Sequence, residues 1–86
     1  SSNGMNQSVS KADLKKFVEA NMAVQKVAPA KKDSRQEQQA AQKKMREAIK
    51  DSGISLENYM KVARAIRNDK EVKKRLKKVM NDMSDE

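Results

Sequence analysis

The sequence predicts an all-α protein, a small bundle of four helices with a flexible N-terminal tail. Apolar residues recur at helical spacing in four segments, and a Ser or Asp that can cap a helix stands before each of them. No segment shows the apolar and polar alternation, rich in β-branched residues, that is typical of a strand. With 86 residues, 36% of them apolar, the chain can build one core. We therefore expect a single helical-bundle domain over residues 9–86 and a disordered tail over residues 1–8.

The first helix is predicted at about 11–28. Ser10 and Asp13 have the spacing of a capping box, in which each side chain accepts a hydrogen bond from the backbone amide of the other residue. Pro29 lacks a backbone donor and is expected to end the helix. The apolar residues of this segment share one face: Leu14, Phe17, Ala20, Val24, Val27 and Ala28.

The second helix is predicted at about 35–52, and Ser34 begins a second capping signature before it. Its apolar stripe is narrow and consists of Ala41, Met45, Ala48 and Ile49. We expect Gly53 to end this helix in the left-handed conformation, which glycine adopts at little cost. The next residue, Ile54, is then expected to pack against Ile49.

The third helix, predicted at about 56–67, is capped by Ser55. It has the broadest apolar face in the chain, so we expect it to occupy the centre of the bundle. The fourth helix, predicted at about 70–83, follows Asp69 as its N-cap. Its apolar residues form a single stripe: Val72, Leu76, Val79, Met80 and Met83.

The composition removes several classes of function. The chain has no Cys and no His, so thiol chemistry, imidazole acid-base catalysis and the common zinc sites lack their side chains. No apolar run approaches the roughly 20 residues of a transmembrane helix. One enzymatic arrangement, a site assembled from Tyr59, Lys61 and a carboxylate, matches no known reaction class. We therefore expect a non-enzymatic protein with no cofactor, no metal and no transmembrane segment.

A set of spaced positions gives the chain a resemblance to a known family. They run from the first helix to the fourth and comprise Leu14, Phe17, Ala20, Val24, Gln25, Met45, Ile49, Gly53, Ile54, Ser55, Tyr59, Ala63, Asp69, Val72 and Val79. In this order they resemble the bacterial family called domain of unknown function 4168, over about 10–80. The resemblance implies a small exported protein, periplasmic or secreted, with no assigned activity. The family has no agreed catalytic motif, so no functional residue is transferred.

The fourth helix is strongly basic. The chain has 20 Lys and Arg against 12 Asp and Glu, a net charge of +8, and a helical wheel gathers four lysines opposite the apolar stripe, with Lys73 and Arg75 at the margins. The four are Lys70, Lys74, Lys77 and Lys78. We expect them to contact an acidic protein or an anionic envelope surface. A charged face of this kind also serves solubility alone, and that interpretation stays open.

A DNA-binding protein is the alternative. Gly53 lies between two predicted helices as in a helix-turn-helix motif, and three cations follow it on the next helix, Lys61, Arg64 and Arg67. The net positive charge agrees with a nucleic acid partner, and this function places the protein in the cytoplasm. A helix C-cap followed by an N-cap explains the same turn residues without any role in DNA binding.

Overall fold

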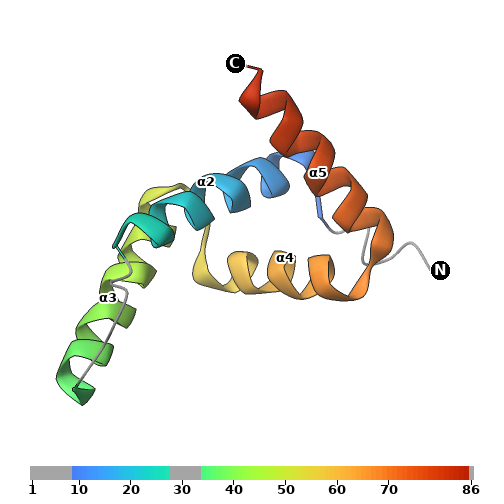
Figure 1. Ribbon diagram of the computed structural model, residues 1–86. Helices are drawn as coiled ribbons and strands as arrows, with labels where there is room; N and C mark the ends of the chain where they lie inside the picture. Colours follow the sequence, from blue (N-terminus) through green and yellow to red (C-terminus); the bar gives the residue numbers. More distant parts are fainter. Residues whose placement is uncertain (1–8, 28–33, 86) are drawn as a thin grey trace.

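The structure is a computed structural model that describes residues 9–27 and 34–85 (Figure 1). These residues form α2 (Lys11–Val27), α3 (Arg35–Asp51), α4 (Leu56–Asn68) and α5 (Lys70–Ser84), and they contain no strand. The predicted all-α fold is confirmed, and every described helix end lies within one residue of its predicted place. The predicted tail at residues 1–8 and the predicted helix end at Pro29 lie outside the described residues.

Each of the four described helices begins directly after the capping residue that the sequence predicts for it. At α2, the Asp13 amide donates to Ser10 Oγ at 3.0 Å and the Ser10 amide donates to Asp13 Oδ2 at 3.2 Å, so the capping box is confirmed. Ser34 and Ser55 cap α3 and α4 by accepting from a backbone amide three residues later. The Asp69 carboxylate accepts from the first amides of α5.

The turn between α3 and α4 also has the predicted geometry. Gly53 has φ 88°, in the left-handed region, and its amide donates to the Lys50 carbonyl oxygen at 3.0 Å. Ile49 and Ile54 on either side of it are both 5% exposed and belong to one buried cluster. Gly53 therefore turns the chain so that Ile54 and Ile49 are buried together at the C-terminal end of α3.

The core consists of two apolar clusters along α2. The first, between α2, α4 and α5, contains Val9, Leu14, Val62, Ala65, Val72 and Val79. The second, between α2, α3 and the start of α4, contains Ala20, Ile49 and Ile54. The rings of Phe17 and Tyr59 border one cluster each and stack on one another with their centroids 4.8 Å apart, which joins the clusters.

α2 and α4 each pack against the three other described helices, so the expected central helix, α4, shares that place with α2. α2 packs against all three other helices, with α3 and α5 at its opposite ends (Figure 1). The physical reason is that α2 buries apolar residues toward both clusters, Leu14 in the first and Ala20 in the second. α4 also reaches both clusters, with Val62 and Ala65 in the first and Tyr59 packed against the second.

Candidate functional site

The basic face of α5 lies opposite its buried stripe. Val72 and Val79 are buried at 0% and 5% exposure, whereas all four lysines of the predicted face are exposed, namely Lys70, Lys74, Lys77 and Lys78. The helical wheel therefore separated the two sides of this helix correctly. Exposure leaves the ammonium groups accessible to anions in solution.

Several cations of α5 are unfavourably placed for the stability of their own helix. Lys70 is the first helical residue, where the helix dipole disfavours a positive charge. The pairs Lys70 with Lys74 and Lys74 with Lys78 stand four residues apart, and such like-charge pairs cost roughly 0.2–0.5 kcal/mol each. The last turn, where the dipole favours a cation, has no basic residue. Their placement therefore calls for another explanation, either solubility or a partner.

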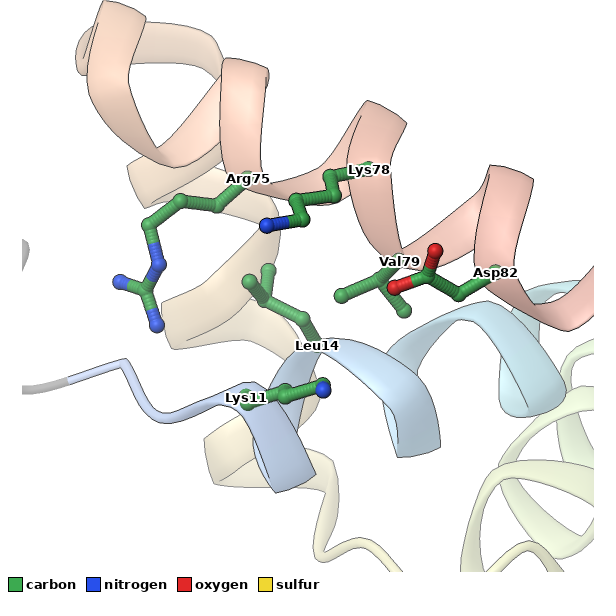
Figure 2. A pocket seen from close by; sticks show the side chains of 6 residues that line it. All are labelled: Lys11, Leu14, Arg75, Lys78, Val79 and Asp82. Atoms are coloured by element: carbon green, nitrogen blue, oxygen red, sulfur yellow. The ribbon is translucent and has the colours of Figure 1, made fainter.

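A pocket of about 210 Å³ lies between the start of α2 and the middle of α5. Six residues line it, Lys11, Leu14, Arg75, Lys78, Val79 and Asp82. Figure 2 shows Arg75 and Lys78 extending from α5 toward α2, and Lys11 on the other side of Leu14. Leu14 is 0% exposed and Val79 is 5% exposed, so these two side chains form a closed apolar floor beneath the charged groups.

The charges around this pocket favour an anion. Three cationic side chains line it, from two different helices, against the single carboxylate of Asp82. Lysine ammonium groups act as point charges with three donors each, and the planar guanidinium of Arg75 can donate two parallel hydrogen bonds to a carboxylate or a phosphate. Residues from two elements can therefore surround one anionic group, which a single row of lysines on a helix cannot do.

The sequence prediction missed how these cations are grouped. The helical wheel placed Lys78 on the outer face with Lys70, and Arg75 only at a margin; in the structure both Lys78 and Arg75 line the pocket. Lys11 of α2 was not proposed at all. A wheel of α5 describes one helix and carries no information on which residues of α2 lie beside it. The remaining predicted lysines, Lys70, Lys74 and Lys77, are exposed but do not line this pocket.

The cations of the DNA-binding alternative lie on α4. Lys61, Arg64 and Arg67 are all exposed, whereas Val62 and Ala65 of the same helix are 1% exposed. The predicted contact residues are therefore accessible. In the part of the chain that the structure describes, none of the three lines the pocket between α2 and α5.

The phenol of Tyr59 is turned toward α2. Its hydroxyl donates to Asn21 Oδ1 at 3.4 Å, and its ring stacks on Phe17. Burial raises the pKa of Tyr59 above its usual value of 10.0. The hydroxyl thus has a partner within the fold, and its environment favours the neutral form over the phenolate.

Residues 9–27 and 34–85 bring together no group of three His, Cys, Asp or Glu side chains that could hold a metal ion. Within the same ranges, no helix combines the length and the apolar character that crossing a membrane requires.

The comparisons with known proteins place the sequence in a family. Neither the curated proteins nor the solved structures gave a match. One family model matches residues 5–76, which includes α2, α3, α4 and the first half of α5. The matched part is most of the chain and contains the turn at Gly53 and the stacked pair Phe17 and Tyr59. The chain therefore belongs to the family described as Domain of unknown function (DUF4168).

Proposed function

We propose that the protein is a non-enzymatic binding module that contacts an anionic partner through its α5 cation surface. This surface is defined by the lysines of the basic face together with the pocket cations, Lys70, Lys74, Lys77, Lys78, Lys11 and Arg75. The observation that carries the proposal is the pocket between α2 and α5, where cations from two helices surround one hollow. Exposed lysines continue from it along α5.

The dimensions of the surface suit a partner with several anionic groups. From Lys70 to Lys78 the helix rises about 12 Å, at 1.5 Å per residue. One carboxylate or phosphate of the partner can enter the pocket while adjacent anionic groups of the same partner contact the lysines farther along α5. An acidic protein and an anionic envelope surface both offer such a row, and each lysine near an anionic membrane contributes about 1 kcal/mol.

The side-chain chemistry supports a binding role over catalysis. The chain has neither Cys nor His, and the hydroxyl of its one tyrosine is engaged with Asn21. What the pocket offers is positive charge above an apolar floor. Such a site holds an anion, and no thiol, imidazole or hydroxyl side chain is among its lining residues.

We also propose that the protein acts outside the cytoplasm, in the periplasm or as a secreted protein. The support is the membership of the chain in its family, together with the sequence resemblance, which implies a small exported protein. Cell fractionation followed by detection with an antibody tests this proposal. We expect the protein in the periplasmic or extracellular fraction, and recovery from the cytoplasm alone contradicts it.

The anion-binding proposal is tested by following backbone amide shifts in NMR while poly-glutamate is added at physiological salt. We expect the largest shifts at Lys11, Arg75 and Lys78 and at their neighbours on α2 and α5. This experiment uses the unmodified chain, so no variant has to fold. Shifts spread evenly over exposed lysines on all four helices indicate attraction to the net charge and contradict a defined site.

DNA binding is the second candidate, favoured by the turn at Gly53 and the exposed cations of α4. In this function α4 enters the major groove and Lys61, Arg64 and Arg67 contact phosphates and base edges. The same NMR titration with duplex DNA then shifts the amides of α4 most. Arg64→Gln is expected to weaken binding to a preferred DNA sequence. If the wild type does not bind duplex DNA at physiological salt, this candidate is excluded.

A further inference from the structure

An apolar groove lies away from the α5 cation surface, between α2, α3 and α4. It encloses about 630 Å³ and is lined by Val24, Gln42, Met45, Arg46, Ile49, Leu56, Tyr59 and Met60. Aliphatic, aromatic and thioether side chains predominate among them, so the surface offered to an occupant is mainly apolar.

Met60 leaves a large apolar side chain in contact with solvent at this groove. It is 53% exposed, and Met22 and Met80 are the other described large hydrophobic residues with comparable exposure, 48% each. Met60 lines the groove whereas the other two do not. An exposed apolar side chain within a concave apolar surface is typical of a docking site. Methionine side chains also adapt their shape to a partner, and Met45 lies in the same groove.

One wall of the groove is cationic. A second hollow of about 360 Å³ adjoins it along α3 and shares Arg46 and Leu56 with it. The other residues of that hollow are Lys43, Lys50 and Glu47. Three exposed cations thus stand against one carboxylate along this edge. When a partner places apolar side chains in the groove, the residues that flank those side chains lie close to Lys43, Arg46 and Lys50.

We propose that this groove docks an acidic amphipathic helix of a partner protein. Along α3 the lining residues run from Gln42 to Ile49, eight residues with a rise of about 10 Å. That length corresponds to two turns of a partner helix, whose apolar residues at i, i+3 or i+4, and i+7 fill such a groove. Carboxylates beside those positions then meet Arg46 and the adjoining lysines.

The charge of the chain distinguishes this occupant from a second copy of the protein. Two copies carry +8 each and bring the same cationic wall to the contact, so their association is opposed by repulsion. A helix with carboxylates on its flanks is attracted to the same wall. The acidic helix therefore satisfies the apolar and the charged parts of the surface together.

The proposal is tested with two synthetic helical peptides of about 14 residues, or roughly four turns. Both carry Leu at i, i+3 and i+7; one has Glu at the flanking positions and the other has Lys. Fluorescence anisotropy at physiological salt measures their binding to the full chain. We expect the Glu peptide to bind and the Lys peptide to bind at least about tenfold more weakly.

Two pairs of variants locate the binding. Met60→Gln is expected to weaken the binding of the Glu peptide about tenfold. Met80→Gln, the same change at a similarly exposed methionine of α5, is expected to leave this binding unchanged. Arg46→Gln is expected to lower the affinity and its salt dependence, and Arg35→Gln, at the start of the same helix, is the charge control. Circular dichroism verifies that each variant keeps its helices.

Several results overturn the proposal. Equal effects of Met60→Gln and Met80→Gln, or equal binding of the two peptides, show that the groove does not recognise an acidic helix. A dimer in sedimentation that Met60→Gln dissociates assigns the groove to a second copy. Binding to anionic vesicles that Met60→Gln abolishes assigns it to a lipid. Replacing Lys70, Lys74, Lys77 and Lys78 with Gln should leave peptide binding intact, which separates this groove from the α5 cation surface.

Discussion

Gly53 shows how one residue fixes the relation between two helices. Its φ of 88° lies in the left-handed region, where a side chain costs about 1–2 kcal/mol. There is room for a methyl group, because an added Cβ would lie 3.9 Å from its nearest neighbour, Lys16 Cε. The requirement for glycine at this position is therefore conformational and does not come from crowding.

Gly53→Ala is expected to lower the free energy of unfolding by about 1 kcal/mol or more, because alanine resists the left-handed conformation. Gly53→Asn is the matched variant and should lose less, since asparagine tolerates positive φ better. Urea unfolding followed by circular dichroism measures both. Equal stability of the wild type and the alanine variant would contradict the role given to this turn.

Tyr59 is the residue whose environment predicts a pH dependence. Burial raises its pKa in the folded state above the usual 10.0. The folded state therefore holds the phenolic proton more tightly than the unfolded state does. The resulting stabilisation is complete below the unfolded-state pKa and is lost as the pH rises through the folded-state pKa.

The variant Tyr59→Phe removes this titration and keeps the ring that stacks on Phe17. Lysines also titrate in this range, so the difference between the two proteins is the quantity to measure. We expect the free energy of unfolding of the wild type to fall more steeply above pH 10.0 than that of the variant. Parallel curves would show that the burial of Tyr59 has no effect on its ionisation. Since the chain has one tyrosine and no tryptophan, tyrosinate absorbance gives the pKa directly.

At the residue scale, what could be predicted from the sequence is local. The helix caps and the Gly53 turn depend on residues at most five positions apart in the sequence. Local sequence patterns were therefore enough to predict them. The hydrogen bond from Tyr59 to Asn21 joins residues 38 positions apart. No spacing rule relates such a pair, so the sequence does not predict this hydrogen bond.

At the scale of the element, α5 combines a buried stripe with a charged face. Val72 is 0% exposed within the first cluster, so Val72→Ala is expected to cost about 2 kcal/mol of stability. Met80 on the same helix is 48% exposed, and Met80→Ala should change stability by about 0.5 kcal/mol or less. Thermal unfolding of both variants makes the comparison. Similar losses in the two would mean that α5 is not docked as the structure has it.

The helix boundaries could be predicted closely because capping residues in the sequence mark them. The pocket, in contrast, depends on how α2 packs against α5. Ser10, Ser34, Ser55 and Asp69 each fix the start of one helix through contacts within four residues. The presence of Lys11 and Lys78 in one pocket depends on the packing of α2 against α5. That packing is decided by Leu14, Val72 and Val79 in a shared cluster, from opposite ends of the sequence.

At the scale of the whole molecule, α2 connects the two clusters and separates the two surfaces. The first cluster holds α5 and its cations, and the second closes the end of α3 beside the apolar groove. The net charge of +8 acts over the whole molecule. At low salt it attracts any polyanion without a site. A test of the α5 cation surface therefore needs physiological salt and a control with the same net charge.

The most direct measurement compares two quadruple variants with the wild type in binding to anionic vesicles and poly-glutamate at physiological salt. The first replaces Lys70, Lys74, Lys77 and Lys78 with Gln. The second replaces four exposed lysines of α2 and α3 with Gln, namely Lys15, Lys16, Lys26 and Lys44, and so removes the same charge. We expect only the first variant to lose binding, with a shallower salt dependence in proportion to the contacts removed. Equal losses in the two variants, or no binding by the wild type to either probe, would contradict a specific role for the α5 cation surface.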